Sequence, residues 1–363
     1  AREARRRSRG AGDVTEPADA VVGWDIGGVN VKAARVPLRR ASAREAGTVV
    51  LPFEIWRAPE RLGEVLEAAA DRLGLAGDEP AAITMTAELS DAFPTRREGV
   101  RGILRALGAA FPRAPLAVVG IDGELASVTD ALTHPLDFAA TNWVASALYV
   151  AAHVPACVLV DVGSTTTDIV PVAGGRILAQ GRTDAERLAR GELVYTGILR
   201  TNPATFVERV PLRGRLTRVA AEWFTQTADV YLLLGRIGVG EYTCPTPDGR
   251  TISPAAAHAR LARLVCEDAE SLAAPEAEAL AAYLAEAQVR QVADGLAEVL
   301  SGLPPEHAAS PVVAVGAGAF VAVEAARRVG LPVFDGAAVG VPALAAFPAA
   351  AAAALLVEDL RRR

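Results

Sequence analysis

The strongest constraint on the fold is a short pattern that occurs twice in the chain. An apolar strand ends in aspartate, a turn of small residues follows, and a second strand returns. The first copy reads Asp25-Ile-Gly-Gly and the second reads Asp161-Val-Gly-Ser-Thr-Thr-Thr-Asp168. Glycine tolerates the positive φ angles of a tight hairpin, and successive backbone N–H groups in such a turn converge on an anion. The two copies predict two similar α/β lobes that hold a phosphorylated ligand between them.

The specificity of this signal comes from its repetition. An Asp-x-Gly-Gly turn occurs in many plain β-hairpins, so the first copy alone favours an ordinary hairpin. The surrounding segments also repeat, with strands expected at 21–25, 31–38 and 48–56 in the first half and at 156–161, 168–172 and 176–181 in the second. A period of about half the chain is too long for a solenoid repeat. It indicates a duplicated lobe.

The length of 363 residues also exceeds what one hydrophobic core usually serves. Apolar periodicity predicts helices at 60–73, 96–110, 141–154, 218–234, 255–273, 275–300 and 320–329, and a last one at 342–357, broken or kinked at Pro348. We therefore expect a disordered basic arm (1–20), an N-terminal lobe (21–140), a connecting helix (141–155), a C-terminal lobe (156–345) and a C-terminal helix (346–363).

Composition narrows the function classes. The net charge of -6 argues against nucleic-acid binding, although residues 1–9 hold a local run of arginines. The longest apolar stretch is short for a bilayer span and contains prolines, and the three cysteines lack metal-ligand spacing. We expect a cytoplasmic protein with small-molecule substrates and no nucleic-acid or membrane partner. A homo-oligomer is compatible with all of this.

The first turn is also unusual in its cation. Lys+Arg totals 37, yet Lys32 is the single lysine of the sequence, and Asn30 beside it is one of three asparagines. A compact ammonium retained next to a Gly-Gly turn suggests a site that a planar guanidinium would not fit, while a chance surface lysine is the competing explanation.

The residue types in both turns suit a phosphate group with a metal ion. Asp25 and Asp161 would repel a phosphate directly, so we expect them to hold Mg²⁺ through water. Hydroxyls and backbone N–H groups would bind the phosphate oxygens. The residues expected to bind diphosphate here are Gly27, Gly28, Asn30, Lys32, Gly163, Ser164, Thr165, Thr166 and Thr167.

A third glycine element, Gly316-Ala-Gly318, lies between an expected strand and an expected helix. Small residues there permit close approach of a nucleotide to a helix N-terminus. The spacing falls short of a dinucleotide fingerprint, and it leaves ATP binding open.

Taken in this order, the three elements resemble the actin, sugar-kinase and Hsp70 superfamily, which implies two RNase H-like (actin-like ATPase) lobes with a central ligand cleft. The threonine-rich second turn is similar to the hydantoinase/oxoprolinase branch. Further segments resemble the methanofuran-type synthases of that branch: Thr86-Ala-Glu-Leu-Ser-Asp91, Arg96-Arg-Glu-Gly-Val100, Asn142-Trp-Val-Ala-Ser146, Arg190-Gly-Glu-Leu-Val-Tyr-Thr-Gly197 and Thr227-Ala-Asp-Val-Tyr231.

This resemblance implies a transferase that condenses an aminomethylfuran diphosphate with the phenol of γ-glutamyltyramine and releases diphosphate, in methanofuran or methylofuran biosynthesis. Mg²⁺ on the diphosphate would neutralise its charge. Glu88, Asp91 or Asp168 would accept the phenol proton, and Arg96 and Arg97 would bind the anion. Two alternatives stay open: an ATP-dependent small-molecule kinase, and a non-enzymatic nucleotide-dependent switch.

Overall fold

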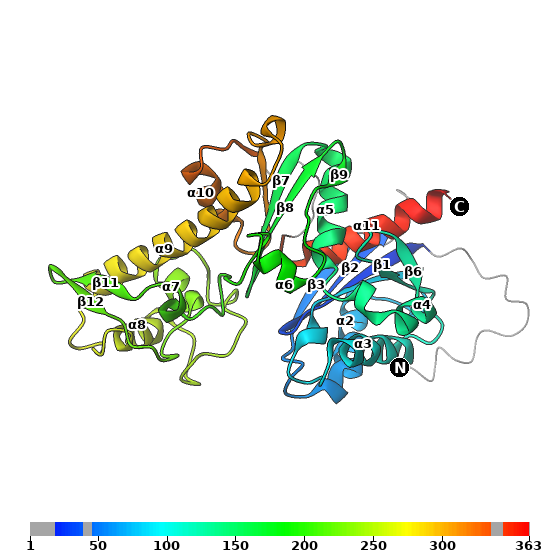
Figure 1. Ribbon diagram of the computed structural model, residues 1–363. Helices are drawn as coiled ribbons and strands as arrows, with labels where there is room; N and C mark the ends of the chain where they lie inside the picture. The colour runs from blue at the N-terminus through cyan, green and yellow to red at the C-terminus, as the bar shows by residue number, and fades with distance from the viewer. Residues whose placement is uncertain (1–18, 39–45, 335–343, 363) are drawn as a thin grey trace, which may run out of the picture.

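The computed structural model describes residues 19–38, 46–334 and 344–362, and the chain forms two lobes, each built on a mixed sheet (Figure 1). The first sheet has the order β3-β2-β1-β4-β5-β6. Its strands are β1 (Ala20–Ile26), β2 (Asn30–Pro37), β3 (Gly47–Pro52), β4 (Ala81–Met85), β5 (Leu116–Val119) and β6 (Leu125–Ser127). Helices α2 (Leu62–Leu73), α3 (Arg96–Ala110) and α4 (Val128–Thr133) pack on it around the buried ring of Trp24.

The second sheet repeats this plan in the order β10-β8-β7-β13-β14, with β9 paired to β8. Its strands are β7 (Cys157–Val162), β8 (Thr167–Ala173), β9 (Arg176–Ile177), β10 (Leu193–Val194), β13 (Val312–Val315) and β14 (Val333–Phe334). In both lobes the first strand pairs antiparallel with the next strand and parallel with a strand that follows a crossover. The predicted duplication of the hairpin topology is confirmed.

The register of the two hairpins is also the same. Ile26 pairs with Val31 across the first turn, and Val162 pairs with Thr167 across the second. One position further from each turn, Asp25 faces Lys32 and Asp161 faces Asp168. The duplicated position therefore carries an acid–base pair in one lobe and two acids in the other.

Two helices join the lobes through a shared core. Helix α5 (Asn142–His153) packs on β7, β8 and β9, whereas α11 (Phe347–Arg362) packs on β1, β2 and β4 although it ends the chain (Figure 1). The expected kink at Pro348 is wrong, because this proline lies in the first turn of a continuous helix, where the missing N–H costs nothing. A Cβ at Gly23 would stand 1.8 Å from the Ala349 carbonyl oxygen, so glycine permits the close approach of α11 to β1.

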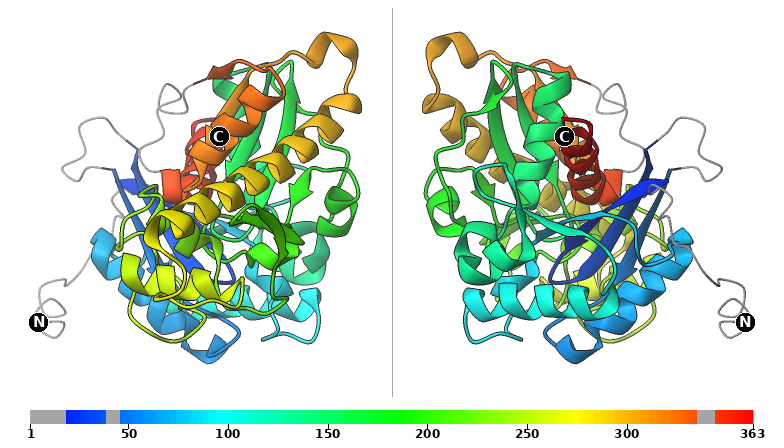
Figure 2. Two further views of the ribbon diagram at one scale, coloured as in Figure 1. Left: turned by 90° about the vertical axis from the view of Figure 1, so that its left-hand side faces the viewer. Right: turned by 90° about the vertical axis from the view of Figure 1, so that its right-hand side faces the viewer.

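The second lobe carries an additional segment, at the left of Figure 1. It contains the hairpin β11 (Arg209–Leu212) and β12 (Arg215–Arg218) with helices α7 (Thr227–Leu233) and α8 (Pro254–Arg263). Helix α9 (Ala274–Ser301) runs diagonally from the sheet to α8 (Figure 2). The remaining helices are α6 (Asp184–Leu188) and α10 (Ala319–Arg328).

Two expected helices are shorter than predicted. The helix expected at 218–234 begins only at Thr227, because residue 218 ends β12 and the Asp229 carboxylate caps the Gln226 N–H at 3.3 Å. The helix expected at 255–273 ends at Arg263, shortly before Cys266 adopts a left-handed φ of 59°. Within the described ranges no helix has the length and apolarity needed to cross a bilayer. Residues 1–18 of the expected arm lie outside the described residues.

Candidate active site

The two turns are closed in the same way. The Gly27 N–H donates to the Asn30 carbonyl at 2.9 Å, and the Gly163 N–H donates to the Thr166 carbonyl at 2.8 Å. The positive φ angles expected for these glycines are not present, because a four-residue turn closes with ordinary backbone angles. A Cβ on Gly27 would stand 3.1 Å from the Asn30 carbonyl oxygen, whereas a Cβ on Gly28 would meet no atom within 4 Å, so packing favours glycine only at position 27.

The carboxylates behind the turns differ in their partners. Lys32 Nζ donates to Asp25 Oδ2 at 2.9 Å, and the Asp25 side chain is buried. In the second hairpin Arg187 pairs with Asp168 Oδ1 at 2.7 Å, while Asp161 has no ion pair with any described residue. Asp161 and Asp168, which face each other across the second hairpin, therefore have one cationic partner from their own lobe among the described residues, Arg187.

The pKa values of this cluster follow from burial and from the facing charges. Burial, then the neighbouring Asp168, raises the pKa of the Asp161 carboxyl to about 7, although Lys32 from the first lobe acts to lower it. Burial acts to lower the pKa of the Lys32 ammonium, yet Asp25, Asp161 and Asp168 together raise it above its usual value. Lys32 therefore lies close enough to the carboxylates of both hairpins for their charges to interact with its ammonium group.

This cluster limits how a metal ion could bind. Among the described residues, no group of three or more His, Cys, Asp or Glu side chains could hold a metal ion. Mg²⁺ usually takes one or two carboxylates and completes its shell with water and substrate phosphates. Asp161, which faces Asp168 across the hairpin and has no ion-pair partner among the described residues, fits that pattern. Asp25 is engaged by Lys32, and the metal role expected for it stays a prediction.

The second turn is held from behind by the segment after β10. The N–H of Ile198 donates to the Gly163 carbonyl, and those of Leu199 and Arg200 both donate to the Ser164 carbonyl. A Cβ on Gly197 would stand 2.4 Å from the Thr165 nitrogen, so only glycine fits there. These contacts hold the turn in place, and Ser164 at its tip lines the cavity between the lobes.

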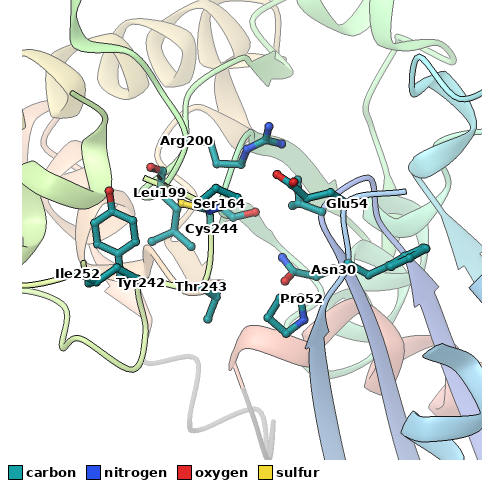
Figure 3. A pocket seen from close by; sticks show the side chains of 13 residues that line it. Asn30, Pro52, Glu54, Ser164, Leu199, Arg200, Tyr242, Thr243, Cys244 and Ile252 are labelled. Atoms are coloured by element: carbon teal, nitrogen blue, oxygen red, sulfur yellow. Dashed lines mark hydrogen bonds between the residues drawn. The ribbon is translucent and has the colours of Figure 1, made fainter. Parts of the chain in front are cut away.

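A cavity of about 290 Å³ lies between the turns. Asn30, Pro52 and Glu54 of the first lobe face Ser164, Arg200 and Cys244 of the second (Figure 3). Its full lining is Val29, Asn30, Pro52, Phe53, Glu54, Ser164, Leu199, Arg200, Tyr242, Thr243, Cys244, Pro245 and Ile252. The structure thus brings residues of both predicted phosphate turns to one cavity.

Glu54 is a cavity residue that the sequence did not indicate, whereas Arg200 is one that only the family resemblance placed near a substrate. The Arg200 guanidinium lies 4.8 Å from the centre of the Trp56 ring on the other lobe, and it makes no ion pair with any described residue. Its backbone is anchored to Ser164, so the free cation stands beside the second turn.

The three carboxylates expected to act as a base do not line the cavity. Glu88 is buried in the turn Ala87–Leu89 after β4, and neither of its carboxyl oxygens has a hydrogen-bond partner. Burial, with a smaller effect of Asp184, raises its pKa to about 8, so the carboxyl is protonated at neutral pH. Asp91 is exposed, and Asp168 is paired with Arg187.

The other predicted anion ligands are also dispersed. Arg96 begins α3 and reaches Asp184 of the second lobe at 3.4 Å, while Arg97 is exposed. Thr167 donates its hydroxyl to the Thr196 carbonyl and is buried. Their roles in binding diphosphate remain predictions.

The third glycine element has a packing role. A Cβ on Gly316, which has a φ of 84°, would stand 2.2 Å from Asp161 Oδ1. A Cβ on Gly318 would stand 2.5 Å from the side chains of Ile198 and Val162. Both glycines let the strand–helix junction close on β7, and neither lines the cavity.

Comparison with known proteins places the chain in context. The model of the family described as hydantoinase/oxoprolinase matches residues 80–359. A relative from Methanocaldococcus jannaschii is 36% identical over 251 residues, 69% of this chain and 72% of its own length. A relative from Methanococcus vannielii is 38% identical over 120 residues, 33% of this chain and 54% of its own length. Both are (4-{4-[2-(gamma-L-glutamylamino)ethyl]phenoxymethyl}furan-2-yl)methanamine synthases.

The fold has a relative among solved structures. Nucleotide-free acetone carboxylase, an ATP-dependent enzyme, superposes with a TM-score of 0.60 at 13% identity, over 93% of this chain and 70% of its own. At that identity the likeness shows the two-lobed fold and nothing about the reaction.

Proposed function

Because this chain belongs to the hydantoinase/oxoprolinase family, we propose that it is a transferase that forms the aryl ether of the synthases it resembles. The product named for those relatives joins a phenol oxygen to a furan methylene. The substrates are then an aminomethylfuran diphosphate and γ-glutamyltyramine, as the sequence suggested. The product serves methanofuran or methylofuran biosynthesis.

In this reaction the bond between the furan methylene carbon and the diphosphate oxygen breaks, and the phenol oxygen bonds to the same carbon. The electron pair of the broken bond leaves with diphosphate, and the phenol proton passes to a base. The furan ring spreads the positive charge that develops at the methylene carbon. The chief task of the protein is therefore to stabilise the leaving anion.

One observation carries the proposal: two turns of the kind expected to bind an anion, one from each lobe, meet at a cavity that also holds the Arg200 guanidinium. The Gly163 N–H closes the second turn, so the later backbone N–H groups of this turn and the Ser164 hydroxyl would bind the diphosphate. Arg200 can bind two phosphate oxygens at once. Lys32 adds a cation from the first lobe.

Mg²⁺ bound to the diphosphate would supply further neutralisation, and Asp161 is the carboxylate that fits it best. Glu88, Asp91 and Asp168 do not line the cavity, so a base at the reacting oxygen need not come from them. A bound water that passes the proton on would serve equally well.

The test is direct. Purified protein is incubated with both substrates and Mg²⁺, and diphosphate release is measured together with the mass of the ether product. We expect both products in equal amounts, and at least a ~10-fold loss of kcat/KM in Arg200→Ala, since charge-assisted hydrogen bonds contribute about 1.5–3 kcal/mol. Arg250→Ala, at an exposed position outside the cavity, is the matched control.

Absence of diphosphate release from the wild-type protein would refute the proposal. The same assay run with ATP in place of the furan substrate addresses the kinase alternative. ADP formation that depends on a hydroxyl-bearing acceptor would support the kinase. The likeness to an ATP-dependent enzyme concerns the fold alone and does not favour a kinase.

A further inference from the structure

One side of the cavity is built to accept hydrogen bonds. Asn30 is only 7% exposed, and its side-chain oxygen has no hydrogen-bond partner. A buried amide oxygen without a partner costs free energy, unless a ligand donates to it. Asn30 points into the cavity from the end of the first turn (Figure 3). Its position therefore indicates that a donor on the ligand completes the site.

Glu54 stands on the same side. Arg57 pairs with its Oε2 at 2.5 Å, while its other carboxyl oxygen has no partner among the described residues. The Glu54 side chain is 18% exposed, whereas Arg57 is 68% exposed and lies toward solvent. A carboxylate oxygen and an amide oxygen together suit a cation that carries N–H groups.

The opposite side of the cavity has the opposite charge. Arg200 and the Ser164 hydroxyl come from the second lobe, and the Arg200 guanidinium has no carboxylate partner among the described residues. Pro52 on the first lobe and Leu199 and Ile252 on the second add apolar surface to the lining. A ligand that complements this arrangement has an anion at one end, a flat apolar middle and an ammonium group at the other end.

We propose, on the basis of the proposed function, that this cavity holds the furan substrate and that Glu54 and Asn30 recognise its primary ammonium group. Arg200 and Ser164 lie on the diphosphate side of the ring. Glu54 and Asn30 thereby select furans that carry an aminomethyl group over furans that do not.

The size of the cavity favours the furan over the phenol substrate. About 290 Å³ is at the lower end of the range for small-molecule sites, roughly 300–1,000 Å³. That volume suits one ring with two short substituents. The γ-glutamyl tail of the phenol substrate is longer and carries both an ammonium and a carboxylate, so it needs more room and a second cation.

The experiment compares two furan diphosphates that differ only in the presence of the aminomethyl group or a methyl group in its place. Calorimetry measures binding of each one without the phenol, and the diphosphate-release assay then gives KM and kcat. The variants are Glu54→Gln, which keeps the shape of the side chain, and Arg57→Gln. Glu64→Gln is the matched control, because Glu64 also pairs with an arginine three residues away, at an exposed site.

We expect the wild-type protein to bind the aminomethyl furan at least ~10-fold more tightly than the methyl furan. Glu54→Gln removes most of that preference without weakening binding of the methyl furan. Arg57→Gln keeps or increases the preference, because it removes a competing cation from Glu54. Glu64→Gln behaves as wild type.

Two results would overturn the inference while the proposed function stands. In one, the wild-type protein releases diphosphate from both furans with the same KM. In the other, Glu54→Gln lowers kcat equally for both furans, which would make Glu54 the base and not an ammonium ligand. Failure of the wild-type protein to bind either furan would overturn the proposed function and this inference together.

Discussion

The buried carboxyl of Glu88 makes stability depend on pH in a way that one substitution can test. Glu88 is 1% exposed, and both of its carboxyl oxygens lack a hydrogen-bond partner. A Cβ on Gly99 would stand 2.4 Å from its carbonyl oxygen, so α3 covers the residue closely. Burial, and to a smaller degree the negative charge of Asp184, raises the pKa from 4.5 to about 8.

The sign follows from proton counting. The folded chain keeps the Glu88 proton up to about pH 8, whereas the unfolded chain loses it near pH 4.5. Between these values the folded state binds more protons, so the free energy of unfolding falls as the pH rises, and the loss is complete above pH 8. One pKa unit corresponds to about 1.4 kcal/mol, which makes the loss between pH 5 and pH 8 roughly 3–4 kcal/mol.

Glu88→Gln removes the titrating group and keeps the volume. We expect the stability of this variant relative to the wild-type protein to increase by roughly 3–4 kcal/mol from pH 5 to pH 8. Urea denaturation at half-unit pH steps, followed by fluorescence, measures the difference. Glu67→Gln, the same chemical change on the exposed side of α2, is the control. If the curves for Glu88→Gln and the wild-type protein run parallel within about 0.5 kcal/mol, the protonated buried carboxyl is refuted.

Two further substitutions test how the second turn is held. Gly197→Ala places a methyl group 2.4 Å from the Thr165 nitrogen and must displace the turn, so we expect kcat/KM for the furan diphosphate to fall by on the order of 10²-fold. Gly240→Ala, where a Cβ meets nothing within 4 Å, is the control, and equal activity of the two variants would contradict the role of Gly197. Arg187→Met leaves Asp168 without its partner, and urea denaturation should show a loss of about 3–5 kcal/mol. The exposed Arg182→Met should cost little, and the same small loss in both would show that the Arg187 ion pair is dispensable.

The sequence predicted what depends on local pattern. Strand alternation and glycine turns placed β1, β2, β7 and β8 to within a residue or two, and the register of both hairpins follows from their turns. The sequence also selected Asn30 and Ser164, which the structure places at one cavity. These predictions succeeded because each depends on residues a few positions apart in the chain.

Other features depend on which distant segments meet. Arg200 is an ordinary arginine in the sequence, and it becomes a candidate phosphate ligand only because its backbone is tied to Ser164 and it pairs with no carboxylate in the part of the chain that the structure describes. Glu54 likewise gains a role from the lobe it faces. Glu88 seemed a ready base, and only its burial shows that it is protonated at neutral pH.

By itself, then, the sequence determined a duplicated lobe with the same aspartate–glycine hairpin in each copy, because hairpin geometry is encoded locally. The tertiary structure decided how the copies are used. It placed the Lys32 ammonium near the two acids of the other hairpin, returned α11 to the first sheet, and left Arg200 free at the cavity. Charge pairing and burial act between segments that are far apart in the chain, and they are settled only when the lobes pack.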